Sequence, residues 1–219
     1  MSFPTRVFVV TDLGVVPEAA LAARLRAVPV GSGWRVVVQL RDRGLAPEER
    51  AALAGRLRGL TRELGNLLVV NGDVELALAV GADGVHLPGA MAAEVEAARV
   101  AFSGRGLAAY VSVACHTVDE VMIACASGAD AALLSPIFAS PGKGTPLGLG
   151  ALRVVRARLR SAYRPPGAHE LALVALGGVD ASNAGACMDE GADGVAAIRA
   201  EPAALLAAIG GPGRTSTNR

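Results

Sequence analysis

His116 is the side chain in this sequence that is best suited to acid/base chemistry. It closes a predicted strand, and Thr117 and two acids at 119–120 follow at once, which is the pattern of a helix start. An imidazole has an ordinary pKa of about 6.5, so it can accept and return a proton near neutral pH. His116 is therefore the candidate general acid/base, with a hydrogen-bonded cap residue as the alternative.

A pair of glycines and a cation mark a candidate anion site. Gly177 and Gly178 directly follow one predicted strand, and Ile198 and Arg199 follow the next. Backbone N–H groups in such strand-to-helix turns bind phosphate, and glycine lets a ligand approach the backbone closely. We predict a phosphate site here, while a turn that simply requires glycine stays open as the alternative.

The segment 135–144 is long and rich in proline and glycine, which is typical of an active-site lid. It carries Ser140 and Lys143, which we expect to lie over a ligand. Polar donors that suit an anionic or amide-bearing group also follow the second and third predicted strands. These further candidates are Gln39, Arg41, Arg43 and Asn71.

Histidine and cysteine show no metal-ligand pattern. His86 ends the fourth predicted strand, but no third ligand stands at a recognisable spacing, so a structural role is preferred and no metal site is predicted. Cys115 adjoins His116, but neighbours on a strand face opposite ways, which favours a buried thiol over a nucleophile. With Cys125 and Cys187, the cysteines are odd in number and indicate reduced thiols.

Short apolar runs alternate with segments rich in Ala, Leu and Arg at helical spacing. This alternation indicates parallel strands joined by crossover helices, and eight such pairs predict one (β/α)8 TIM barrel. Reactive groups of such barrels lie at the C-terminal strand ends, where the candidates above are placed. The predicted strands span 6–11, 35–40, 67–71, 83–87, 107–112, 131–135, 171–176 and 193–198.

The predicted helices are joined to the strands by a recurring turn. Gly-Ala-Asp occurs at 81–83, 128–130 and 191–193, and we interpret it as a shared turn with glycine in the left-handed C-cap position. Chance recurrence in a chain rich in alanine and glycine is the alternative. Helices are expected to begin at Pro17 and Pro47 and to span 73–81, 91–102, 117–127, 149–160, 181–190 and 201–209. The helix arginines Arg56, Arg58 and Arg62 are expected on a solvated face.

The composition limits the classes of protein to which the chain can belong. Hydrophobic residues make up 52% and aromatic residues 3%, which suits helices packed closely on a buried parallel sheet. The 21 basic and 20 acidic residues form no block of like charge, so we expect no nucleic-acid or membrane partner. The strand-like start predicts a cytoplasmic protein without an export signal. We expect one domain over 1–209 and a flexible tail over 210–219.

Several motifs, in order, resemble those of the thiamine phosphate synthase and thiazole tautomerase (TenI) superfamily over about residues 7–200. The resemblance implies a TIM barrel that binds a thiazole phosphate, with the phosphate held by Gly177, Gly178 and the loop around Ile198. It also suggests a homodimer. The matching segments are VVTD at 9–12, QLRDR at 39–43, VVNGDVELAL at 69–78, GADGVHLP at 81–88, HTVDE at 116–120, SPIFASPGKG at 135–144, and ALGGV to GADGVAAI over 175–198.

Departures from the family's pattern separate its two activities. Synthase members are similar but have Asn-Asp where this chain has Asn71 and Gly72, and an aspartate at the position of Met91. In the family those carboxylates hold the magnesium that neutralises pyrophosphate, so their loss predicts that no magnesium cofactor is bound. Asp73 comes one residue after the position at which synthase members have the first of these aspartates. The lid keeps Lys143 but has Ser140 and Gly142 where synthases have threonine.

Tautomerase members resemble this chain at those places, with Asn-Gly, with Leu-Pro after the fourth strand and with arginine at the position of Arg43, and their catalytic histidine matches His116. We therefore expect an isomerase, a thiazole tautomerase, that makes a thiazole carboxylate phosphate aromatic by a metal-independent proton shift. One alternative is thiamine phosphate synthase, a transferase that condenses hydroxymethylpyrimidine pyrophosphate with thiazole phosphate. The other is a non-catalytic barrel that binds thiazole or thiamine phosphate, which is suggested by Ala114 where the family commonly has serine.

Overall fold

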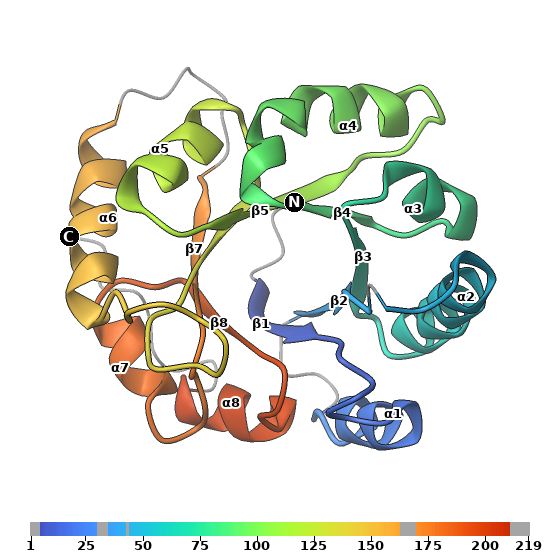
Figure 1. Ribbon diagram of the computed structural model, residues 1–219, viewed down its shortest axis with the longest axis horizontal. Helices are drawn as coiled ribbons and strands as arrows, with labels where there is room; N and C mark the ends of the chain where they lie inside the picture. The colour runs from blue at the N-terminus through green and yellow to red at the C-terminus, as the bar shows by residue number, and fades with distance from the viewer. Residues whose placement is uncertain (1–4, 30–34, 43, 163–169, 211–219) are drawn as a thin grey trace.

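The computed structural model describes residues 5–29, 35–42, 44–162 and 170–210. Its eight strands are parallel and form a closed barrel, in sequence order around the ring. The (β/α)8 prediction is therefore confirmed, and Figure 1 shows the helices surrounding the strands. The strands are β1 (Thr5–Val10), β2 (Arg35–Leu40), β3 (Leu67–Asn71), β4 (Gly84–Leu87), β5 (Tyr110–Cys115), β6 (Ala131–Leu134), β7 (Ala172–Leu176) and β8 (Gly194–Ala197).

Helices follow the strands around the barrel, and none of those in the described ranges is long and apolar enough to cross a bilayer. Arg43 and residues 211–219 of the predicted tail lie outside the described residues. The helices are α1 (Glu18–Arg26), α2 (Pro47–Glu63), α3 (Val74–Val80), the 3₁₀ helix η1 (Gly89–Glu94), α4 (Val95–Ser103), α5 (Val118–Ala126), α6 (Leu149–Ser161), α7 (Ala184–Asp189) and α8 (Pro202–Ala208).

Two predicted elements need correction. The strand expected at 107–112 runs instead over Tyr110–Cys115. Leu107 is 45% exposed and follows Gly106, whose φ of 70° places it in a turn, so the apolar run begins before the sheet does. β5 therefore ends directly before His116. The helix expected at 91–102 begins as the 3₁₀ turn η1 and becomes α-helical only at Val95.

The strands bury both faces, which explains their continuous apolar runs. One set of alternating residues, including Phe8, Val37 and Val174, packs inside the barrel. The other set, including Val36 and Val38, packs between the strands and the helices. Because the period is two, each strand also presents a fixed set of side chains to the interior at its C-terminal end.

The recurring Gly-Ala-Asp tripeptide has the predicted role. Gly81, Gly128 and Gly191 have φ values of 64°, 77° and 99°, so each ends its helix in the left-handed region. The aspartate that follows then joins two strands. Asp83 Oδ2 accepts a hydrogen bond from Leu68 N at 2.8 Å and receives Arg58 Nη1 at 2.7 Å. The tripeptide is therefore a structural device at the N-terminal end of the barrel.

The same arrangement recurs twice around the ring. Asp130 accepts from Val111 N at 2.7 Å and pairs with Arg99 at 2.9 Å. Asp193 accepts from Leu173 N at 2.8 Å and pairs with an arginine of α6, Arg156. Arg58 is thus not on a solvated face as predicted, because its side chain is only 14% exposed and pairs with a carboxylate.

Asp83→Ala is expected to destabilise the fold by about 2–4 kcal/mol, because it leaves the Arg58 guanidinium and the Leu68 N–H without their acceptor. Urea denaturation measures this loss. The matched control is Glu63→Ala, which breaks the exposed ion pair with Arg26 and should change stability little. Equal losses in the two variants would contradict a joining role for the aspartate.

Candidate active site at the barrel mouth

Buried polar side chains gather toward the C-terminal ends of neighbouring strands. Asn71 Nδ2 on β3 donates a hydrogen bond to Gln39 Oε1 on β2, at 3.5 Å. Beside them, His86 Nδ1 on β4 lies 3.0 Å from Ser112 Oγ on β5. All four residues alternate with the outward-facing core residues of their strands, so they face the interior of the barrel. A polar layer therefore forms the floor of the mouth.

Gln39 is the member of this layer with an unused donor. Its side chain is almost fully buried, and its Nε2 contacts no hydrogen-bond acceptor of the described residues. A buried amide donor without an acceptor costs about 1–3 kcal/mol, so such groups usually bind a ligand or water. Gln39 and the adjacent Asn71 therefore suit the predicted role of holding a polar group of the substrate. His86, buried and hydrogen-bonded, fits its predicted structural role.

His116 lies at the rim, directly after β5, and its side chain is exposed. Its Nδ1 is 2.8 Å from the carbonyl oxygen of Ser135, the residue after β6. Since a carbonyl only accepts, we assign the proton of the neutral ring to Nδ1, which makes Nε2 the basic nitrogen. Ser135 Oγ also lies 3.4 Å from Nδ1, so the polar neighbour that Ala114 cannot provide comes from the next strand.

Cys115 stands next to His116 but is fully buried on the outer face of β5. Burial, and to a smaller degree the negative charge of Glu120, raises the pKa of the Cys115 thiol to about 12. The thiol is therefore protonated at neutral pH, and its burial and raised pKa favour a buried structural thiol over a nucleophile.

The predicted lid, residues 135–144, is anchored at its base. Backbone hydrogen bonds join its first residues to the end of β7 and to a later residue of the same loop, and these bonds hold the base of the lid in place. These bonds run from Ile137 N to Leu176 O (2.9 Å), from Phe138 N to Gly177 O (2.9 Å) and from Leu147 N to Pro136 O (2.8 Å).

The tip of the lid is a four-residue turn. Lys143 N donates to Ser140 O at 3.1 Å, and Gly142 between them has a φ of 70°. Proline at the second position and glycine with positive φ at the third are typical of a type II turn. The turn presents Lys143 as an exposed side chain and keeps Ser140 half-buried.

The glycine pair after β7 packs against this lid. Gly177 and Gly178 have φ values of 92° and 65°. A Cβ on Gly177 would lie 2.7 Å from Pro136 Cα, and one on Gly178 would lie 2.6 Å from Ala139 O. The turn and the close approach of the lid therefore explain both glycines, and their role in binding phosphate stays a prediction.

Three cations stand at different strand ends around the mouth: Arg41 after β2, Lys143 on the lid and Arg199 after β8. Within the described residues, none of these three side chains has an ion-pair partner. Ile198 is half-buried before Arg199, whose carbonyl accepts a hydrogen bond from Arg24 Nη1 at 3.0 Å. This distribution of positive charge suits an anionic ligand.

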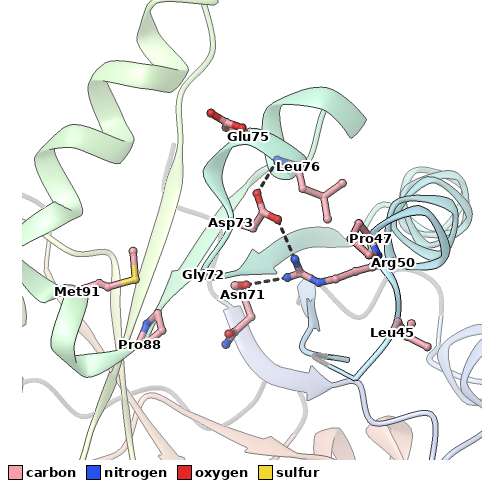
Figure 2. A pocket seen from close by; sticks show the side chains of 10 residues that line it. All are labelled: Leu45, Pro47, Arg50, Asn71, Gly72, Asp73, Glu75, Leu76, Pro88 and Met91. Carbon is pink, nitrogen blue, oxygen red and sulfur yellow. Dashed lines mark hydrogen bonds and ion pairs between the residues drawn. The ribbon is translucent and has the colours of Figure 1, made fainter.

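A pocket of about 580 Å³ opens on one side of the mouth, over the ends of β3 and β4. Asn71 is the predicted site residue that lines this pocket, whereas His116, Lys143 and the glycine pair do not line it. Figure 2 shows Met91 and Pro88 across the pocket from Arg50. The lining residues are Leu45, Pro47, Arg50, Asn71, Gly72, Asp73, Glu75, Leu76, Pro88 and Met91.

Nothing in the sequence marks Arg50 as a site residue, because it is one arginine among several on α2. Its Nη1 pairs with Asp73 Oδ2 and its Nη2 donates to Asn71 O, each at 2.8 Å (Figure 2). Arg50 therefore fixes the backbone at the end of β3, where Asn71 projects into the mouth.

The pocket lacks the two carboxylates that the family's magnesium site implies, and its acidic lining residues are Asp73 and Glu75. Gly72 and Met91, which stand at the family's carboxylate positions, both line the pocket and offer no oxygen side chain. Asp73 is already engaged, since its Oδ1 accepts from Leu76 N at 2.9 Å and its Oδ2 receives Arg50. No group of three or more His, Cys, Asp or Glu side chains suited to a metal occurs in the described part of the chain.

A family model described as thiamine monophosphate synthase (TMP-TENI) matches residues 7–200. The chain belongs to this family. Among solved structures, a thiamine phosphate pyrophosphorylase from Pyrococcus furiosus has a TM-score of 0.71 at 23% identity, covering 95% of this chain and 98% of its own. This likeness supports the barrel fold.

Relatives within the thiamine monophosphate synthase family carry the synthase name. A thiamine-phosphate synthase from Chloroflexus aurantiacus is 36% identical over 202 residues, covering 91% of this chain and 86% of the relative. One from Methanoculleus marisnigri is 38% identical over 181 residues, covering 81% and 77%. These names do not support the expected closeness to tautomerase-type members, and they favour the alternative activity over our principal expectation.

Proposed function

We propose that this member of the family is a thiamine-biosynthesis enzyme that binds a thiazole phosphate and acts as a metal-independent thiazole tautomerase. The observation that carries the proposal is the contact between His116 Nδ1 and the Ser135 carbonyl. It leaves Nε2 of an exposed imidazole as a proton acceptor at the end of the barrel where such enzymes act. The pocket chemistry at Gly72 and Met91 agrees with a reaction that needs no magnesium.

In this reaction His116 Nε2 takes a proton from one position of the non-aromatic thiazole ring and returns it to another. The ring electrons shift as the proton moves, so the product is the aromatic isomer and no atom is gained or lost. The contact to Ser135 stabilises the imidazolium that forms between the two transfers, because Nδ1 keeps its acceptor throughout.

The other predicted residues have proposed binding roles. We assign the phosphate to the turns at Gly177 and Gly178 and at Ile198, with Arg199 and Lys143 supplying positive charge. Gln39, Asn71, Arg41 and Ser140 would contact the polar groups of the thiazole carboxylate. The homodimer stays a prediction.

Thiamine phosphate synthase is the second candidate, and the names of the relatives favour it. Synthesis displaces pyrophosphate, whose negative charge needs a counter-ion in the transition state. In this chain Arg50 is the cation in the pocket, but both of its terminal nitrogens are engaged by Asp73 and Asn71. The chain would need a different way to neutralise the leaving group.

The purified chain should convert the non-aromatic thiazole carboxylate phosphate in EDTA at the rate seen with added magnesium, and the ultraviolet absorbance of the aromatic product measures this. A parallel assay supplies hydroxymethylpyrimidine pyrophosphate, thiazole phosphate and magnesium. Thiamine phosphate in that assay, without turnover in the first, would replace the proposal by the synthase. Binding of thiazole phosphate with turnover in neither assay would instead favour the non-catalytic alternative.

A further inference from the structure

The residue after β5 is tied to the first turn of α5 in an unusual way. Thr117 is the N-cap, and its Oγ1 accepts a hydrogen bond from Glu120 N at 3.1 Å. In an ordinary capping box the glutamate side chain returns to the N–H of the cap residue itself. Here Glu120 Oε2 accepts instead from the N–H of His116, one residue before the cap, at 2.5 Å.

The histidine is therefore held at two points. The Ser135 carbonyl fixes the imidazole through Nδ1, and the Glu120 carboxylate fixes the backbone N–H of the same residue. A hydrogen bond to an ionised carboxylate is shorter and stronger than one between neutral groups. Both contacts come from residues outside β5, one at the first residue of the lid and one on α5.

The neighbouring loop packs closely onto this arrangement. Gly89 begins η1, and a Cβ there would lie 2.9 Å from Ala114 O and 3.8 Å from Glu120 Oε2. Glycine at this position lets the loop after β4 approach Ala114 and Glu120. Glu120 as a residue is half-buried, while its bond to His116 N lies at the exposed rim.

We propose that Glu120 is a positioning residue for the proton transfer, acting through His116. The Glu120 carboxylate fixes the backbone of His116 and thereby keeps Nδ1 of the ring in contact with the Ser135 carbonyl. Nε2 then stays at one place on the rim as the proton-accepting atom. This inference rests on the proposed function of His116. It differs from helix capping alone, because the contact that carries it is made to His116 and not to Thr117.

Three variants separate the two roles. Glu120→Ala removes the contact to His116, Glu120→Gln keeps an acceptor oxygen at the same place, and Thr117→Ala removes the cap while leaving the Glu120–His116 bond. We expect Glu120→Ala to lower kcat for tautomerisation about tenfold with KM little changed, because the acid/base is misplaced. Glu120→Gln should restore most of kcat, and Thr117→Ala should lower stability but not kcat. A kcat loss in Glu120→Ala no larger than in Thr117→Ala would overturn the proposal.

A second readout does not depend on turnover. Nitrogen-15 NMR of histidine-labelled protein distinguishes the two ring tautomers, and the His116→Asn variant identifies which signals belong to His116. Wild type and Thr117→Ala should show one Nδ1-protonated form, and Glu120→Ala should show a mixture. Unchanged His116 signals in Glu120→Ala would overturn the positioning role. Absence of tautomerisation in the wild type, with the mixture still present, would overturn the proposed function and leave the positioning intact.

Discussion

His116→Asn is expected to lower kcat for tautomerisation by about 10²–10⁴-fold, the usual contribution of a general acid/base. Asparagine is a conservative test at this position. Its amide can still donate to the Ser135 carbonyl that receives His116 Nδ1, so the rim contact is kept while the basic nitrogen is removed. A steady-state assay of the purified variant in EDTA measures the loss.

The same variant should fold normally and bind the ligand. His116 is exposed, so its replacement removes little buried surface, and the midpoint of thermal unfolding should stay close to that of the wild type. Thiazole phosphate should bind both proteins with similar affinity, because the proposed phosphate contacts lie in the turns after β7 and β8 and on the lid. A wild-type kcat in the variant would remove His116 from the mechanism.

Gly178→Ala is expected to destabilise the protein by about 2–4 kcal/mol, from a positive φ together with overpacking. The added Cβ would lie 2.6 Å from Ala139 O and 2.7 Å from Phe138 Cβ, so the lid must move away. KM for the phosphorylated substrate should rise as well, because the displaced lid carries Lys143. Urea denaturation and steady-state kinetics measure the two effects.

Gly128→Ala is the matched control for this prediction. Gly128 has a φ of 77°, and a Cβ there would meet nothing within 4 Å. Its substitution should cost only the left-handed backbone term, about 1–2 kcal/mol, and leave KM unchanged. The excess loss in Gly178→Ala then measures the packing of the lid on the glycine pair. Equal losses in both variants would show that this packing carries no energy.

Local signals in the sequence were enough to predict the barrel and the position of His116. The left-handed glycines at 81, 128 and 191 follow from a residue preference that needs no tertiary information. His116 could be placed at the rim because the helix start after it is encoded by Thr117 and its neighbours. Both features depend on a few adjacent residues.

Features that depend on distant residues were missed. Arg58 pairs with an aspartate 25 residues away, and nothing in its helix distinguishes it from a solvated arginine. The start of β5 was misplaced because hydropathy does not separate Leu107–Ala109 from the strand that follows. Likewise, the packing of the lid on Gly178 is a contact between two loops that no periodicity encodes.

The proposed proton transfer requires the thiazole ring to lie beside His116. A crystal structure of the chain with the aromatic thiazole carboxylate phosphate tests this directly. We predict the ring beside His116, with Nε2 within about 2.6–3.2 Å of the atom that exchanges its proton, and the phosphate against the turns after β7 and β8. A ring bound instead between Met91 and Arg50, with the imidazole of His116 out of reach, would contradict a role of His116 in the proton transfer.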